Sequence, residues 1–224
     1  PSPFAREDIF PKALEDSLAR LQRNSIDLLQ HHFPSNRMSI PKLMNLMADA
    51  VEAGKVKAVG VSNYSAEQMR LAHAELAKRG VPLASNQVQY SLLYRKPEVD
   101  GVLDACRELG ITLIAYSPLA QGALTDKYSP EIKASGLRRF LPNFNRKAME
   151  AVQLVVQLLR QIGGRYGKSP SHVALRWLLE NENVLPIPGA KNSRQAAENV
   201  GALSFALTPE EVQMLSQATV AWRV

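Results

Sequence analysis

One stretch of the chain, ITLIAYSPLAQGALTDK at residues 111–127, combines residue types that suit a ligand with phosphates. Its first residues are apolar and predict a strand buried on both faces, and Ser117-Pro118 then begins a loop that reaches Lys127. Tyr116 therefore stands at the carboxyl end of the strand, where sheets of parallel strands bind ligands. An aromatic ring, a hydroxyl, backbone N–H groups and a cation suit a flat ligand that carries phosphates. The alternative is that Tyr116 belongs to the core and that the loop begins with an ordinary turn.

Two neighbouring histidines stand at the end of the first predicted strand. Successive strand residues point to opposite faces of a sheet, so we expect His31 and His32 to face opposite ways. A pair of histidines also suggests a metal site. The other histidines, His73 and His172, lie on predicted helices without an acidic partner at ligand spacing, so we expect no metal.

Polar residues also follow or interrupt two further predicted strands. Ser62 and Asn63 come directly after an apolar run, and Gln87 lies within the predicted strand 84–90. A glutamine on an otherwise apolar strand needs a hydrogen-bond partner, which favours a binding role. The alternative is that Asn63 or Ser65 begins the next helix as its N-cap and that Gln87 is a buried structural residue.

The turn after the last predicted strand offers a site for an anion. Gly189-Ala190-Lys191 opens this turn, and a polar helix follows it. Glycine permits a close approach of the backbone, and the beginning of a helix favours negative charge. Lys191 and Arg194 can neutralise a phosphate there.

The elements that position these residues repeat along the chain. Predicted strands begin at residues 26, 56, 84 and 111, and a helix with two short loops lies between each pair. This spacing predicts repeated right-handed βα units and a parallel sheet. A long loop at 128–143 then interrupts the repeat. The predicted helices are 7–22, 41–53, 65–79, 97–109, 145–163, 169–180, 193–201 and one that begins at Thr208, and the last predicted strand is 184–187.

Composition narrows the class of protein. The 224 residues are 46% hydrophobic, enough for a sizeable core, and we expect a single domain over residues 1–224. The single cysteine, Cys106, excludes a disulfide framework and favours a reducing compartment. The net charge is +6, but the Lys and Arg residues are spread along the predicted helices among Glu and Asp, with few aromatic residues between them, so we expect no nucleic-acid partner. We expect no membrane span and no secretory signal, hence an intracellular protein, cytoplasmic or in a plastid.

Four segments together resemble the aldo-keto reductase superfamily. They are GVSNYS at 60–65, SNQVQYS at 85–91, AYSPLAQGALTDKY at 115–128 and PIPGAKNSRQAAENVGAL at 186–203, and their order and spacing match from Arg6 to about Thr219. The resemblance implies an α/β fold, the (β/α)8 barrel, and an enzyme that uses NADPH to reduce small aldehydes and ketones without metal or flavin.

The resemblance also implies roles at the reacting end of the cofactor. His32 matches a neutral histidine that helps orient the substrate carbonyl. Ser62, Asn63 and Gln87 match residues that hydrogen-bond the nicotinamide carboxamide, which needs both donors and acceptors. Tyr116 matches the aromatic residue that stacks on the nicotinamide.

Other matched residues would bind the rest of the cofactor. Ser117 to Gly122 match a loop over the pyrophosphate, and Glu198 and Asn199 match contacts to the adenine. NADH has a free ribose diol, for which a carboxylate would be expected at this position. Lys191 is a cation instead and suits the 2′-phosphate of NADPH, so we expect NADPH rather than NADH. The residues implied here are Ser117, Pro118, Leu119, Gln121, Gly122, Lys127, Gly189, Lys191, Gln195, Glu198 and Asn199.

The resemblance is incomplete at one end. We count five predicted strands where the family barrel has eight, and the missing three are N-terminal, so the chain is expected to be a truncated product or a piece of a longer one. The family's proton-donating tyrosine, with its aspartate and lysine, belongs to those strands, so we expect no carbonyl reduction by these 224 residues alone. Two alternatives are a nucleotide-binding sensor, similar to the potassium-channel β subunits, and a fragment that does neither. The sequence indicates neither the substrate nor the oligomeric state.

Overall fold

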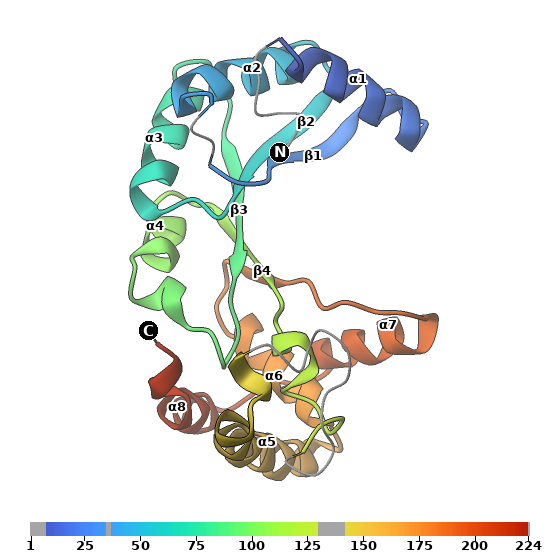
Figure 1. Ribbon diagram of the computed structural model, residues 1–224, viewed down its shortest axis with the longest axis vertical. Helices are drawn as coiled ribbons and strands as arrows, with labels where there is room; N and C mark the ends of the chain where they lie inside the picture. Colours follow the sequence, from blue (N-terminus) through green and yellow to red (C-terminus); the bar gives the residue numbers. More distant parts are fainter. Residues whose placement is uncertain (1–7, 35–36, 130–141, 224) are drawn as a thin grey trace. The chain divides into compact units, whose positions relative to one another are not determined.

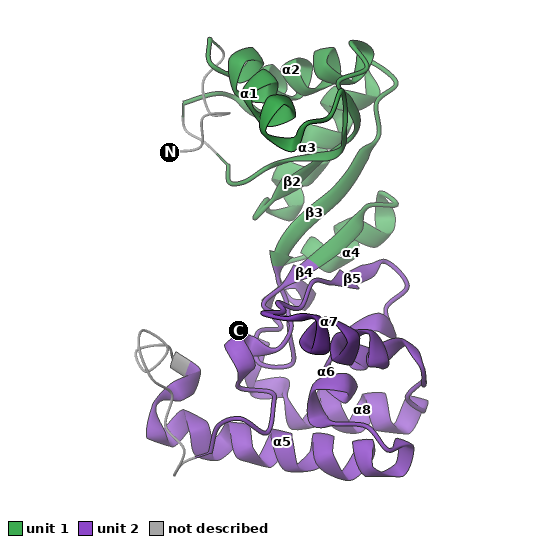
Figure 2. Cartoon of the chain, turned by 90° about the vertical axis from the view of Figure 1, so that its right-hand side faces the viewer, with its two compact units in different colours: residues 1–88, 100–114 green, residues 89–99, 115–224 purple. Residues whose placement is uncertain are grey.

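A computed structural model describes residues 8–34, 37–129 and 142–223 of the chain. The chain forms two compact units, coloured separately in Figure 2. Unit 1 comprises residues 1–88 and 100–114, and unit 2 comprises residues 89–99 and 115–224. The expectation of a single domain over residues 1–224 stays a prediction.

Unit 1 alternates helices and strands, as the spacing predicts. β1 pairs with β2 and β2 with β3, both in parallel, so that Ile26 lies opposite Val56 and Val61 opposite Asn86. β4 follows β3 in the strand order. Figure 1 shows α1, α2 and α3 on one side of these strands. The elements are α1 (Phe10–Leu21), β1 (Ile26–His31), α2 (Ile40–Glu52), β2 (Val56–Ser62), α3 (Ala66–Ala77), β3 (Leu83–Gln89), α4 (Val102–Glu108) and the first residues of β4 (Thr112–Tyr116).

Local sequence signals set the ends of these helices. Ser65 and Gln68 form the predicted capping box of α3, each side chain bonded to the backbone N–H of the other at 3.2 and 3.0 Å. The predicted helix 97–109 is wrong in its first part. Gly101 adopts φ +78°, which no continuing α-helix allows, so a short 3-10 helix η2 (Lys96–Glu98) precedes α4.

Unit 2 contains the longer helices and the last strand. The backbone N–H of Ile187 donates to the carbonyl of Ala115 at 3.0 Å, which joins the chain beyond β5 to the end of β4. Thr208 and Glu211 form the predicted capping box of α8. The elements are η3 (Ala120–Gly122), η5 (Pro142–Phe144), α5 (Arg146–Tyr166), α6 (Pro170–Leu179), β5 (Val184–Pro186), α7 (Ser193–Val200), η6 (Gly201–Leu203), α8 (Pro209–Ala218) and η7 (Val220–Trp222).

The fold class agrees with the sequence-based prediction. The strands follow the order β1-β2-β3-β4-β5, with helices between them along the chain. Within the described residues the sheet does not close, as expected for an incomplete (β/α)8 barrel. No helix in the described ranges is both long and apolar enough to cross a membrane.

Candidate functional site

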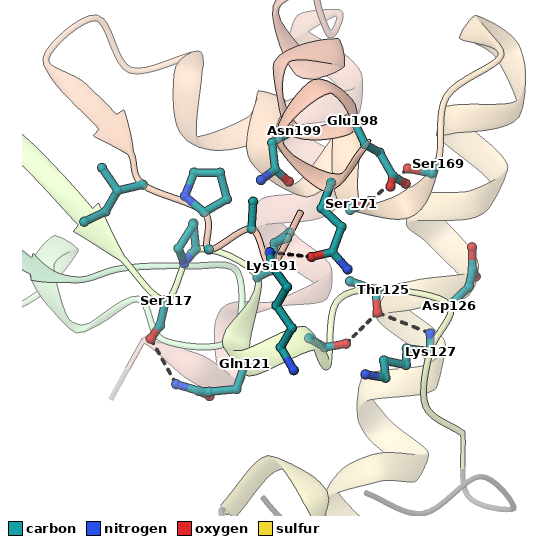
Figure 3. Close-up of a pocket in the computed structure, with 18 of the residues that line it drawn as sticks. Ser117, Gln121, Thr125, Asp126, Lys127, Ser169, Ser171, Lys191, Glu198 and Asn199 are labelled. Atoms are coloured by element: carbon teal, nitrogen blue, oxygen red, sulfur yellow. Dashed lines mark hydrogen bonds between the residues drawn. The ribbon is translucent and has the colours of Figure 1, made fainter. Parts of the chain in front are cut away.

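Unit 2 contains a cavity of about 620 Å³ at the carboxyl ends of β4 and β5 (Figure 3). Its walls come mainly from two segments, residues 117–128 after β4 and residues 187–199 after β5, and Ser169 and Ser171 from the beginning of α6 complete it. β4 and β5 are neighbours in the sheet, so the segments that leave them meet although they are far apart in sequence.

Most of the residues expected to bind the cofactor line this cavity. Eleven of them do so, and eight further lining residues were not predicted individually. The predicted residues are Ser117, Pro118, Leu119, Gln121, Gly122, Lys127, Gly189, Lys191, Gln195, Glu198 and Asn199. The additional ones are Thr125, Asp126, Tyr128, Ser169, Ser171, Ile187, Pro188 and Ala190.

The segment after β4 is held in an unusual backbone conformation. Ser117, Ala120 and Gln121 have φ values of +53°, +47° and +54°, in the left-handed region that residues other than glycine rarely adopt. The side-chain amide of Gln121 donates to the Ser117 hydroxyl at 3.0 Å, and the Ala120 N–H donates to the Ser117 carbonyl at 2.9 Å. Such strained residues gather at binding sites, where the surrounding structure maintains them.

The far end of the same segment is anchored to α5. Asp126 pairs with Arg160, and the carbonyl of Tyr128 accepts a hydrogen bond from the Gln153 amide at 2.8 Å. Lys127 lies between these anchors, exposed, with its ammonium nitrogen 5.4 Å from the centre of the Tyr128 ring. The cation is therefore carried by a fixed piece of backbone at the cavity wall.

The segment after β5 begins α7 with a tightly bonded turn. Asn192 caps the helix by accepting a hydrogen bond from the Gln195 N–H at 3.0 Å, and the Gln195 side chain accepts one from the Lys191 N–H at 2.8 Å. Lys191 is exposed beside this helix terminus, where an anion is favoured. A Cβ atom added at Gly189 would meet nothing within 4 Å, so the fold itself does not require a glycine there.

Four further predicted residues are joined by hydrogen bonds in unit 1. The Asn63 amide donates to the His32 carbonyl at 3.2 Å and to the Ser62 hydroxyl at 3.0 Å. The carbonyl of Gln87 accepts both the Ser62 hydroxyl at 2.7 Å and the Asn63 N–H at 2.9 Å. The ends of β1, β2 and β3 are thereby tied together around Asn63.

The two histidines do face opposite ways. His32 is exposed and its ring lies 4.6 Å from that of Phe33, whereas His31 is only 2% exposed. In the described part of the chain, no three His, Cys, Asp or Glu residues are arranged to hold a metal ion.

The alternative of a buried, structural Gln87 is wrong. Its side chain is only half-buried, while its neighbour Asn86 is fully buried and donates its amide to the Tyr64 carbonyl at 3.0 Å. Adjacent strand residues point to opposite faces of a sheet, and a shift of one residue reverses the two faces. The sequence does not show which of two adjacent amides faces the helices.

Tyr116 lies at the end of β4, as predicted, but does not line the cavity. It is half-buried, and this burial raises the pKa of its phenol, with a smaller contribution from Tyr94. Its carbonyl accepts a hydrogen bond from the Tyr90 N–H at 3.3 Å. Its stacking on a nicotinamide stays a prediction.

Comparison with known proteins agrees with the resemblance to the aldo-keto reductases. The model of the aldo/keto reductase family matches residues 3–219. The chain is 37% identical over 211 residues to aldo-keto reductase str7 of Strobilurus tenacellus. The matched region covers 92% of this chain and 61% of that protein. It is 36% identical over 217 residues to aldo-keto reductase yakc [NADP(+)] of Schizosaccharomyces pombe, covering 94% of this chain and 62% of that protein.

A solved structure is similar over the same extent. The glycerol dehydrogenase AKR11B4 from Gluconobacter oxydans superposes with a TM-score of 0.88 at 28% identity, covering 97% of this chain and 65% of that one. The chain thus spans about six-tenths of the length of the two curated relatives, 61% of str7 and 62% of yakc.

Proposed function

The chain belongs to the aldo/keto reductase family, a family of oxidoreductases, and from this we propose that it binds NADP(H) and serves the reduction of aldehydes and ketones to alcohols. The observation that carries the proposal is the cavity of unit 2. Eleven residues chosen from sequence alone, from two segments far apart in the chain, line one space of about 620 Å³. The meeting of these two segments around one space supports the proposal.

The chemistry of the cavity supports a phosphorylated nucleotide. Lys127 and Lys191 bring two cations to its walls, and α7 begins beside Lys191. Open space at Gly189 leaves room for a ligand against the backbone. Lys191 precedes α7 and Arg194 lies in its first turn, whereas Glu198 lies in its last turn. Two cations and no carboxylate therefore stand at the beginning of this helix, which favours NADPH over NADH. The name of the relative yakc [NADP(+)] supports the same choice.

Unit 1 supplies the groups proposed for the reacting end. Bound NADPH would supply a hydride to the substrate carbonyl. Gln87 offers a side-chain amide that can hold a carboxamide in one orientation. Asn63 can contribute only its side-chain oxygen, because its amide N–H groups bond His32 and Ser62. These bonds and those of the Gln87 carbonyl fix that loop. His32, exposed at the end of β1, can donate a hydrogen bond to a carbonyl oxygen.

Calorimetric titration with NADPH and NADH tests the proposal. We expect saturable binding of NADPH, weaker binding of NADH, and loss of both in Gly189→Val, which places a branched side chain where the ligand would approach the backbone. Gly164→Val on α5 is the control, because a Cβ atom there also meets nothing within 4 Å. Equal binding by both variants would contradict the assignment of the cavity.

Turnover separates the reductase from the alternative of a nucleotide-binding sensor. The measurement is the loss of NADPH absorbance in the presence of a panel of aldehydes and ketones. It is made on a chain extended upstream to include the family's N-terminal strands and their tyrosine, because the 224 residues alone are expected not to reduce carbonyls. Saturable oxidation that depends on the carbonyl compound supports the reductase. Tight NADPH binding without oxidation for any compound would favour the sensor.

A further inference from the structure

The α7 wall of the cavity is held with little help from hydrophobic burial. None of the side chains of α7 is buried, although Gln195, Glu198 and Asn199 line the cavity. Most helices in proteins are fixed by an apolar face packed against the core. The position of α7 therefore depends on polar contacts to its neighbours.

His172 on α6 makes such a contact. Its Nε2 lies 2.6 Å from the backbone carbonyl oxygen of Glu198. Its Nδ1 lies 3.1 Å from the backbone nitrogen of Ser169 and 2.8 Å from the Ser169 hydroxyl, which in turn lies 2.9 Å from the hydroxyl of Ser171. The imidazole thus bridges the beginning of α6, where two serines line the cavity, and the last turn of α7.

The partners of the ring determine its tautomer. A backbone N–H can only donate, so Nδ1 must accept from Ser169 and carries no proton. A carbonyl oxygen can only accept, so Nε2 carries the proton and donates it to Glu198. The neutral imidazole satisfies both contacts at once, and the hydroxyl of Ser169 extends the chain of hydrogen bonds.

Gly201 has no side chain, and this leaves room for the His172 ring to reach the Glu198 carbonyl. A Cβ atom there would stand 2.5 Å from Nε2 of His172 and 2.9 Å from Cδ2. The φ of Gly201 is −56°, an ordinary helical value, so its backbone conformation does not call for glycine. The close approach of the His172 imidazole is what requires a glycine at this position.

We infer that His172 is a positioning residue that holds the α7 wall and thereby sets affinity for the adenosine half of the nucleotide. The inference deepens the proposed function and rests on it, because the matched roles of Lys191, Glu198 and Asn199 concern that half of NADPH. The nicotinamide half would not depend on His172, since its proposed contacts lie elsewhere in the chain.

Two variants of similar size separate the two contacts of the ring. In His172→Asn the side-chain oxygen stands where Nδ1 was and can still accept from Ser169, but nothing reaches Glu198. In His172→Gln the amide nitrogen stands near the position of Nε2 and can still donate to Glu198. Affinities are measured for NADPH, for 2′,5′-ADP as the adenosine half, and for reduced nicotinamide mononucleotide as the other half.

We expect His172→Asn to bind NADPH and 2′,5′-ADP about 3- to 10-fold more weakly, the effect of one hydrogen bond. Reduced nicotinamide mononucleotide should bind unchanged, and His172→Gln should stay near wild type for all three. Equal loss in the two variants, equal loss for both halves of the cofactor, or no loss at all would overturn the inference.

Amide hydrogen exchange gives a second readout that needs no ligand. Exchange in α7 should be faster in His172→Asn than in His172→Gln, while exchange in α5 should be alike in both. If the wild type binds no dinucleotide, the proposed function fails and this comparison alone decides whether His172 holds α7. Equal exchange in the two variants would show that it does not.

Discussion

Nδ1 of His31 lies 3.0 Å from the phenol oxygen of Tyr64, inside unit 1 and edge-to-face with its ring. Both side chains are almost fully buried, and burial raises the pKa of Tyr64 to about 12. Burial, with a smaller contribution from the charge of His32, lowers the pKa of His31 to about 4. Nε2 of His31 is buried without a hydrogen-bond partner among the described residues, so a proton there would gain no compensating contact.

His31 should make the folded state sensitive to mild acid. The folded-state pKa of about 4 lies below the ordinary value of 6.5, so the unfolded chain takes up the proton first as the pH falls. The stabilising contribution is complete above pH 6.5 and is lost as the pH drops towards 4. From pH 7 to pH 5 the loss is about 2 kcal/mol, measured by urea unfolding.

The control for this prediction is His31→Gln, which cannot titrate. Its free energy of unfolding should fall less than that of the wild type over the same pH range. The acidic groups whose pKa values are lowered, such as Asp27 and Glu108, act below this range. Parallel curves for the wild type and the variant would contradict the role assigned to His31.

Lys191→Ala should reduce discrimination between NADPH and NADH. A charge-assisted contact to the 2′-phosphate would make NADPH binding about 10- to 100-fold weaker in the variant, while NADH binding changes little. Both affinities are measured by titration. Lys78→Ala is the control, since Lys78 is an exposed lysine paired with Glu75 in unit 1. Equal loss for the two nucleotides would remove Lys191 from the phosphate site.

Most of the fold was accessible from the sequence because its signals are local. β1 and β2 were expected at 26–32 and 56–61, and they run Ile26–His31 and Val56–Ser62. Glycines after helices and capping boxes mark boundaries without any knowledge of tertiary structure. The start of α4 was missed because the left-handed conformation of Gly101 depends on the turn in which it lies.

The candidate site was predictable only where a motif covers it. Thr125 and Asp126 belong to the motif AYSPLAQGALTDKY at 115–128, so their place in the cavity follows from that motif. Ser169 and Ser171 carried only the signal of a helix start, and nothing in the sequence shows that α6 begins beside α7. The bond from His172 to the Glu198 carbonyl is a tertiary contact of the same kind.

Arg95→Met should destabilise the protein strongly. Arg95 is 4% exposed, and its guanidinium donates to both carboxylate oxygens of Glu98 at 2.7 Å, to the Ser216 carbonyl and to the Thr219 hydroxyl. It also lies 5.2 Å from the ring centre of Trp177. Removing one partner of a buried ion pair costs about 3–5 kcal/mol.

Urea unfolding of single and double variants measures this effect. Arg95→Met/Glu98→Met should lose less stability than the sum of the single variants, because both buried charges of the pair are then removed together, and Arg223, the other partner of Glu98, is exposed. Arg70→Met is the control, since its ion pair with Glu108 is exposed and should contribute little. If Arg95→Met behaves like Arg70→Met, the cluster around Arg95 is not a source of stability.

The last prediction concerns Asn63, which has φ +60° and whose amide bonds His32 and Ser62. Asn63→Ala and Asn63→Gly both remove the amide, but only alanine is strained in the left-handed conformation. The alanine variant should therefore be less stable than the glycine variant by about 1 kcal/mol in urea unfolding. If Asn63 holds the carboxamide, both variants should lose affinity for reduced nicotinamide mononucleotide equally, with 2′,5′-ADP unaffected. An affinity that instead follows stability, lower in alanine than in glycine, would mean that Asn63 only shapes the loop.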